Sequence, residues 1–168
     1  MHKAPLFDID KINVFIFDFD GVLTNNYVFI DQNGIESVSC SRADGLAFDV
    51  LRKLKKQSYI LSTERNQVVK ARAKKLKIPA IHGVNDKVNA LHKLKKNEGL
   101  DFKDFLYMGN DLNDYGAMQL CGLSVCPADS HPKIKEIADI VLKTDGGNGV
   151  VRELLEDKLG LDFIKILY

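Results

Sequence analysis

Apolar residues gather in short runs along the chain, and polar or glycine-containing segments separate the runs. The clearest run, Val-Phe-Ile-Phe, begins at Val14 and stops abruptly at Asp18. A continuous apolar run of β-favouring residues is typical of a strand that is buried on both faces of a parallel sheet. On this pattern we predict strands near 13–18, 58–62, 79–82, 104–108, 122–126 and 139–142.

Between these runs, apolar residues recur at helical spacing. Leu46, Val50 and Leu54 are four residues apart, which places them on one face of a helix. The alternation of strands and helices indicates an α/β fold, a Rossmann-like doubly wound parallel sheet with helices on both faces. A chain of 168 residues suits a single domain, 1–168. We predict helices near 44–56, 65–77, 86–98, 112–121, 131–137 and 148–158.

One segment departs from this alternation. Residues 27–31 and 35–39 flank Asn33-Gly34, which predicts a β-hairpin. The hairpin, about 26–40, is too short to be a cap domain, although it could cover a site as a flap. Its apolar residues and the apolar tail 161–168 would be poorly covered in a monomer, which indicates an interface between subunits.

Composition narrows the classes of partner. The net charge of +1 lacks the basic excess of nucleic-acid-binding proteins, and the apolar runs are too short to span a membrane. The first five residues lack the apolar stretch of a signal peptide. The three cysteines lack metal-binding spacing and are expected to be thiols. We therefore expect a cytoplasmic protein that binds neither nucleic acid nor membranes.

The candidate chemistry lies where the first apolar run ends. Asp18 and Asp20 are one residue apart, and Gly21 can turn the chain so that both acids face one point. Ligands of open α/β sheets bind at the carboxyl ends of the strands. Two neighbouring acids repel each other unless a cation or a shared proton compensates. We expect a metal and phosphate site in which one acid attacks phosphorus and the other transfers protons.

The segment 18–24, Asp-Phe-Asp-Gly-Val-Leu-Thr, resembles the first motif of the haloacid dehalogenase-like phosphohydrolases, D-x-D-G-x-[LV]-[TS]. Three further motifs of that family follow in order: Ser62 after an apolar run, then Lys87, then Gly-Asn-Asp-Leu-Asn-Asp at 109–114. Each is weak alone, but the four together cover nearly the whole chain. The resemblance implies the haloacid dehalogenase-like fold without a cap domain. It also implies a Mg²⁺-dependent phosphatase that works through an aspartyl-phosphate.

The resemblance also implies residue roles. Asp18 would be the nucleophile and Asp20 the general acid and base. Lys87 would neutralise the nucleophile and the phosphate. Backbone N–H groups and a hydroxyl would complete the phosphate-binding set, which comprises Phe19, Ser62, Thr63 and Lys87.

The expected metal site departs from the commoner family pattern. The resemblance implies that Asp18 binds Mg²⁺ through a carboxylate oxygen and Asp20 through its backbone carbonyl. The third ligand stays open, because that pattern has an acid where Asn110 stands. Asn110 could bind through its amide oxygen at lower affinity, Asp111 could replace it, or Asp114 could act through water.

Within the family, the chain resembles the capless phosphatases of eight- and nine-carbon sugar acids. Octulosonate phosphatases usually carry T-G-R-[KD] at the second motif, whereas this chain has Ser-Thr-Glu-Arg-Asn at 62–66. We therefore expect an N-acylneuraminate or other nonulosonate 9-phosphate as substrate, as in sialic acid biosynthesis. The first alternative is 3-deoxy-D-manno-octulosonate 8-phosphate, a lipopolysaccharide precursor. The second is a non-catalytic oligomerisation module related to the C-terminal domain of CMP-sialate synthetases.

Capless members often form homotetramers, so the resemblance implies one here. Glu64, next to the second motif, is a candidate for reading the sugar end of the substrate. Arg72 and Lys75 share one helical stripe, and Arg72 lies roughly 10 Å along the helix from the expected phosphate site. Either residue could grip the substrate carboxylate, in its own or a neighbouring subunit. The competing interpretation is a solvated basic helix face.

Overall fold

A parallel sheet organises the part of the chain that the structure, a computed structural model, describes, which is residues 7–168. Its order is β5-β4-β1-β6-β7-β8, and every neighbouring pair is parallel. β1 therefore lies inside the sheet, between β4 and β6. The predicted α/β fold is confirmed. The first five residues, which were expected to lack a signal peptide, lie outside the described range. The strands are β1 (Val14–Phe17), β4 (Gln57–Leu61), β5 (Ala80–Ile81), β6 (Phe105–Met108), β7 (Leu123–Cys126) and β8 (Ile140–Val141).

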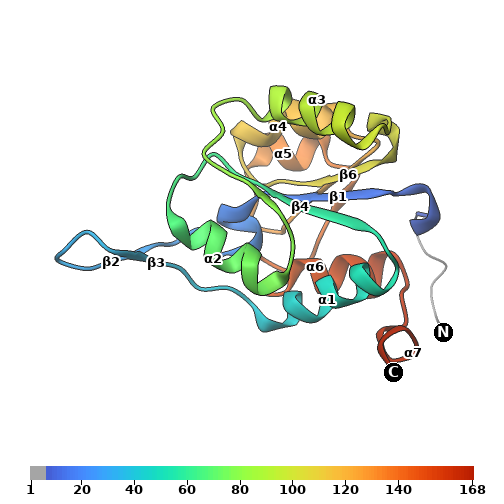
Figure 1. The fold of residues 1–168 in the computed structure, drawn as a ribbon, viewed down its shortest axis with the longest axis horizontal. Helices are drawn as coiled ribbons and strands as arrows, with labels where there is room; N and C mark the ends of the chain where they lie inside the picture. The colour runs from blue at the N-terminus through green and yellow to red at the C-terminus, as the bar shows by residue number, and fades with distance from the viewer. Residues whose placement is uncertain (1–6) are drawn as a thin grey trace.

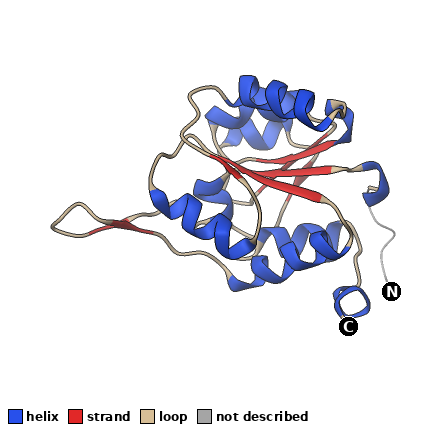
Figure 2. Cartoon of the chain, in the orientation of Figure 1, coloured by secondary structure: helices blue, strands red, loops and turns tan. Residues whose placement is uncertain are grey.

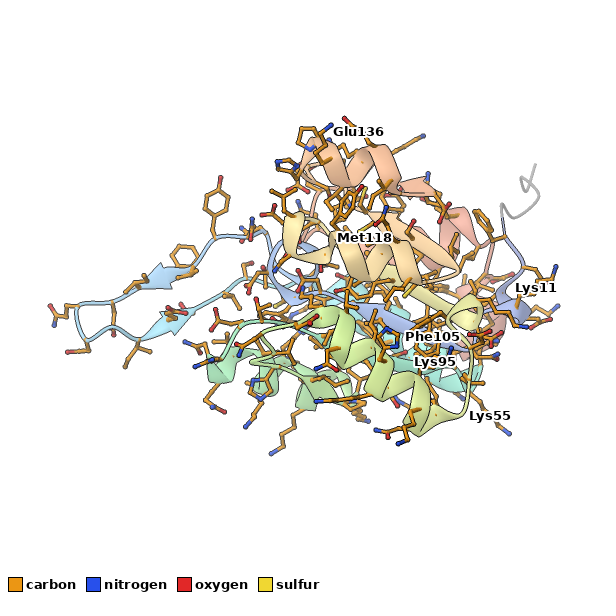
Figure 3. The ribbon with its side chains drawn as sticks, turned by 90° about the horizontal axis from the view of Figure 1, so that it is seen from above. Lys11, Lys55, Lys95, Phe105, Met118 and Glu136 are labelled. Atoms are coloured by element: carbon orange, nitrogen blue, oxygen red, sulfur yellow. The ribbon has the colours of Figure 1, made fainter. Side chains whose placement is uncertain are left out.

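Helices cover both faces of the sheet (Figure 1). Because side chains alternate along a strand, Phe15 and Phe17 pack into one core and Ile16 into the other. Figure 3 looks from above onto the layer of the second core and labels two of its members, Phe105 and Met118. The first face carries α1 (Arg42–Lys53), α2 (Gln67–Leu76) and α6 (Val150–Glu153), and the second carries α3 (Lys87–Glu98), α4 (Tyr115–Leu120) and α5 (Pro132–Ile137).

The end of the chain differs from the expectation. The apolar tail contains a further helix, α7 (Phe163–Leu167). Phe163 is buried in the first core, and the guanidinium of Arg152 lies 5.1 Å from the centre of its ring. Phe163 and the partly buried Leu161, Ile166 and Leu167 thus pack against the core of the same chain, whereas Ile164 and Tyr168 stay exposed. Within residues 7–168, none of the helices combines the length and the apolar composition that crossing a membrane requires.

The segment between β1 and α1 forms a hairpin that projects from the body of the molecule (Figures 2 and 3). β2 (Phe29–Ile30) pairs antiparallel with β3 (Glu36–Ser37), and a bridge between Thr24 and Cys40 closes the base. Asn66, at the start of α2, donates to Glu36 Oε2 at 3.1 Å. The outer part of the hairpin is uncovered in a single chain. Its exposed large apolar side chains are Tyr27, Val28, Phe29, Ile30 and Ile35.

A glycine-rich loop supports the turn that follows β1. Gly147 N donates to Val22 O at 2.9 Å, and Gly146 N donates to Asp129 Oδ1 at 2.9 Å. A Cβ atom at Gly146 would lie 2.0 Å from Gly21 O, so a side chain cannot fit between the two loops. The loop before α6 therefore packs directly against the turn that follows β1 and contains Asp20 and Gly21.

Replacing Gly146 with alanine should lower the free energy of unfolding by about 1–3 kcal/mol, because the added methyl group overpacks a backbone contact. Gly45→Ala is the matched control, since nothing lies within 4 Å of a Cβ at that position in α1. The control should be neutral or stabilising by up to about 1 kcal/mol, because alanine favours helix more than glycine does. Urea unfolding curves measure both values. Equal effects at the two positions would contradict the packing described here.

Candidate active site

β1 places Asp18 at the carboxyl edge of the sheet. Asp18 N donates to Met108 O at 2.9 Å, so the backbone ladder with β6 continues up to the acid. Asp18 Oδ1 accepts a hydrogen bond from Phe19 N at 2.7 Å, which fixes the carboxylate against the next turn. Gly21 then takes a left-handed φ of 79°, which favours glycine. This turn leaves Asp18 and Asp20 lining the same cavity.

A buried lysine joins Asp18 to a second carboxylate. Lys87 is the first residue of α3, and its Nζ lies 2.8 Å from Asp18 Oδ1 and 2.7 Å from Asp114 Oδ1. The three side chains are between 0% and 6% exposed. Breaking a buried ion pair by removing one partner costs about 3–5 kcal/mol, because the remaining charge is uncompensated. Lys87 is therefore held in place by Asp18 on one side and Asp114 on the other.

Asp114 organises this part of the site, although it was expected only as a possible water-mediated metal ligand. Asp114 Oδ1 also accepts from the Tyr107 hydroxyl at 2.7 Å. Asp114 Oδ2 accepts from Asn110 N at 2.9 Å and from Asp111 N at 3.3 Å. The fully buried carboxylate thus holds both Lys87 and the fourth-motif loop. The spacing of Asp111 and Asp114, which form a capping box, was the available sequence signal, whereas nothing in the sequence singled out Tyr107.

Burial shifts the proton affinities of these groups. Burial, followed by the charge of Asp114, raises the pKa of Asp18 to about 8, although Lys87 opposes the shift. Burial alone would lower the pKa of Lys87, but Asp18 and Asp114 outweigh it and raise that pKa, so the ammonium form persists. Burial and the nearby Glu64 raise the pKa of Asp20 as well. A raised pKa suits a carboxyl group that has to carry a proton near neutral pH.

Three groups form an oxygen-rich corner beside Asp18. One terminal atom of the Asn110 amide, the oxygen in this structure, lies 3.2 Å from Asp18 Oδ2 and 2.9 Å from the backbone oxygen of Asp20. Neighbouring ligands of an octahedral Mg²⁺ ion, bound at 2.0–2.1 Å, are about 3 Å apart. The two distances from the Asn110 amide therefore fit that ion.

Other sources of metal ligands are poor in this region. Within residues 7–168, no three His, Cys, Asp or Glu side chains gather into a metal-binding group. Asp111, the other candidate, uses its Oδ1 to accept from Leu112 N at 2.7 Å and so caps the next turn. The Asp18 carboxylate, the Asp20 carbonyl and the Asn110 amide lie close enough together that they could hold one cation.

A cavity of about 230 Å³ opens beside this corner. Ser62 and Thr63, which follow β4 directly and were predicted to bind phosphate, line this cavity together with the fourth-motif loop. Ser62 Oγ accepts from Glu64 N at 3.1 Å, which orients the hydroxyl. Phe19 N, also expected to bind phosphate, donates to the Asp18 carboxylate instead. Asn26, at the base of the hairpin, lines the cavity and was not anticipated.

The expected sugar-binding residues lie outside this cavity. Glu64 Oε1 accepts from Arg65 N at 2.6 Å and from Asn66 N at 2.7 Å, so its carboxylate shapes the turn before α2. Arg72 donates to Ser41 O at 2.6 Å and, with Lys75, lines a second cleft between α1 and α2. The structure therefore brings neither Arg72 nor Lys75 to the phosphate-sized cavity of the same chain.

The fold and the four motifs agree with a comparison against known protein families. The model of the haloacid dehalogenase-like hydrolases matches residues 49–154. The curated 3-deoxy-D-manno-octulosonate 8-phosphate phosphatase KdsC of Escherichia coli strain K12 is 30% identical over 148 residues, which cover 88% of this chain and 79% of the relative. The chain belongs to the haloacid dehalogenase-like family. It is a phosphatase of the capless branch that its motifs resemble.

Solved structures agree with this assignment. A Streptomyces avermitilis protein described as a HAD family hydrolase superposes with a TM-score of 0.90 at 39% identity, covering 97% of this chain and 92% of that protein. The Moraxella catarrhalis 3-deoxy-D-manno-octulosonate 8-phosphate phosphatase gives a TM-score of 0.85 at 28% identity. The match covers 94% of this chain and 88% of that enzyme. That enzyme was crystallised with a magnesium ion, a phosphate ion and a KDO molecule.

The raised pKa of Asp18 predicts a pH dependence that responds to cations. A raised pKa favours the protonated carboxyl group, which cannot attack phosphorus, as the pH falls. A divalent cation near Asp18 Oδ2 favours the ionised form and lowers this pKa. The acid limb of the kcat/KM profile should therefore move to lower pH when Mg²⁺ is raised from limiting to saturating. An acid limb that keeps its position at both concentrations would contradict this electrostatic description.

Proposed function

We propose that the chain is a Mg²⁺-dependent phosphatase of a phosphorylated sugar acid, with 3-deoxy-D-manno-octulosonate 8-phosphate as the first candidate substrate. The buried arrangement of Asp18, Lys87 and Asp114 beside an oxygen-rich cavity carries the chemical part of this proposal. The similarity to the Escherichia coli and Moraxella catarrhalis octulosonate phosphatases supports the substrate class. This similarity favours the octulosonate over the nonulosonate that the second motif suggested.

In the proposed reaction, the Asp18 carboxylate attacks phosphorus and the bond to the sugar oxygen breaks. Asp20 donates a proton to the leaving oxygen, which its raised pKa supports. Water then attacks the aspartyl-phosphate, Asp20 takes up its proton, and inorganic phosphate leaves. Lys87 holds Asp18 in position and balances part of the negative charge throughout.

When bound, Mg²⁺ would offset the charge of the phosphoryl group. Asp18, the Asp20 carbonyl and the Asn110 amide are the groups proposed to hold it, as their 2.9 and 3.2 Å spacings support. Ser62 and Thr63 would bind phosphate oxygens from the opposite wall. Phosphoryl transfer depends mainly on such positioning and charge neutralisation, so no further reactive group is required.

A nonulosonate 9-phosphate is the second candidate substrate. Residues 62–66 lack the T-G-R-[KD] sequence that octulosonate phosphatases usually carry, which favours this candidate. A non-catalytic oligomerisation module is disfavoured, because such a module would have no need for a buried carboxylate paired to Lys87 at 2.8 Å. The two substrates share a carboxylate and a terminal phosphate, so the same cavity could accept either phosphate.

The proposed assembly is a homotetramer in which the hairpin stands in place of a cap. Support comes from the exposed apolar side chains of the hairpin, which a second copy of the chain would cover. Arg72 and Lys75 line a cleft away from their own cavity, so we propose that they meet the carboxylate of a substrate bound to a neighbouring subunit. Glu64, close enough to Asp20 to raise its pKa, would face the sugar from the same chain.

Replacing Asp18 with asparagine should lower kcat by about a thousandfold or more, because the amide cannot attack phosphorus. Asp10→Asn is the matched control, since Asp10 lies in an exposed turn before β1. The release of phosphate from a generic aryl phosphate in the presence of Mg²⁺ measures kcat for both variants. Activity of Asp18→Asn close to that of the control would reject Asp18 as the nucleophile.

A substrate panel should separate the two candidates. We expect kcat/KM for 3-deoxy-D-manno-octulosonate 8-phosphate to exceed that for N-acetylneuraminate 9-phosphate by about tenfold or more, or about 1.4 kcal/mol of transition-state binding. A preference for the nine-carbon substrate would support the second candidate. Equal values for both, and for an aryl phosphate, would remove the specificity proposal and leave the chemistry intact.

A further inference from the structure

The side-chain amide of Asn110 is packed against Asp18 and Asp20. Its inner terminal atom lies 3.2 Å from Asp18 Oδ2 and 2.9 Å from the backbone oxygen of Asp20. The residue is 7% exposed, and its backbone N–H donates to Asp114 Oδ2 at 2.9 Å. Main chain and side chain are thus both held, and the remaining question is which end of the amide faces the acids.

The two orientations of the amide differ by half a turn about its Cβ–Cγ bond. With the nitrogen inward, the amide donates one hydrogen bond to the Asp18 carboxylate and one to the Asp20 carbonyl. With the oxygen inward, the oxygen meets only acceptors and the nitrogen meets only donors. The second orientation leaves three oxygens facing each other, an arrangement that requires a cation.

Packing favours this half turn over a larger movement. A Cβ at Gly21 would lie 2.0 Å from Asn110 Nδ2 and 2.7 Å from Asn110 Cγ, so the amide occupies the space above that glycine. The amide nitrogen and oxygen are similar in size. Turning the amide over therefore needs little extra room, whereas moving the side chain away would pull on a backbone held by Asp114.

We infer that Asn110 has two roles at the proposed metal site. Without a cation its nitrogen donates to Asp18 and Asp20, and with Mg²⁺ its oxygen turns inward as a neutral ligand. The inference rests on the proposed function, because it concerns the same site. Binding of Mg²⁺ then has to replace two hydrogen bonds, one of them to a carboxylate, and gains no charge from residue 110. Asn110 thereby keeps the affinity for the ion below what an aspartate at this position would give.

Titration calorimetry with Mg²⁺ tests the inference without measuring activity. Asn110→Asp removes the competing donor and adds a charge, so the Kd should fall by about tenfold or more. Asn113→Asp is the matched control, because Asn113 lines the same cavity from an exposed position outside the oxygen corner. It should tighten binding by less than about threefold, since an exposed charge is screened. Equal tightening by both variants, or an unchanged Kd in Asn110→Asp, would overturn the inference.

A second measurement uses the unaltered protein, so it does not depend on the folding of a variant. In ¹⁵N-asparagine-labelled protein, the side-chain NH₂ signals of Asn110 should be protected from exchange with water before Mg²⁺ is added. Saturating Mg²⁺ should shift these signals and remove the protection, while the Asn113 signals stay close to their positions. Asn110 signals with the same shift and protection at both Mg²⁺ concentrations would overturn the inference.

The failure of this inference differs from a failure of the proposed function. If the unaltered protein hydrolyses sugar-acid phosphates only with Mg²⁺ and Asn110→Asp binds the ion no more tightly, only the role of Asn110 is wrong. If the unaltered protein neither binds Mg²⁺ nor needs it to release phosphate, the proposed metal site and the role of Asn110 are both wrong.

Discussion

A single buried ammonium group faces two carboxylates in this protein. Lys87 Nζ lies within 2.8 Å of both Asp18 and Asp114, and these side chains are at most 6% exposed. The three charges sum to a net negative charge where water screens poorly, which costs free energy unless a cation or a proton compensates. The raised pKa of Asp18 expresses this imbalance. At the metal site proposed beside Asp18, a divalent cation would restore the balance.

The backbone part of this arrangement could be predicted from the sequence. Apolar runs define strands because both faces of a parallel sheet are buried, and the acids at the end of β1 then have to lie at the edge of the sheet. The pairing of Lys87 with Asp18 was also expected, from the order of the family motifs. These predictions depend on local pattern and topology, which the sequence records directly.

The side-chain network could not be predicted in the same way. Tyr107 reads as one more apolar strand residue, and only the folded chain shows that its hydroxyl reaches Asp114 at 2.7 Å. Two further hydrogen bonds likewise form only in the folded chain. Phe19 N donates to the Asp18 carboxylate, and Arg72 donates to Ser41 O. The helix α7 was missed because its burial depends on Phe163 reaching the core from the end of the chain. The second motif alone favoured a nonulosonate substrate. The similarity to an octulosonate phosphatase extends over 88% of the chain, and it favours the octulosonate instead.

In the proposed mechanism, Asp18 becomes covalently bound to phosphorus beside a cation held by Asp18, Asp20 and Asn110. A crystal structure of the protein with Mg²⁺ and beryllium fluoride, a mimic of the aspartyl-phosphate, would show this arrangement. We expect beryllium fluoride attached to the Asp18 carboxylate, with Mg²⁺ in contact with the Asp20 carbonyl. Beryllium fluoride bound elsewhere, with Asp18 still paired only to Lys87, would contradict it.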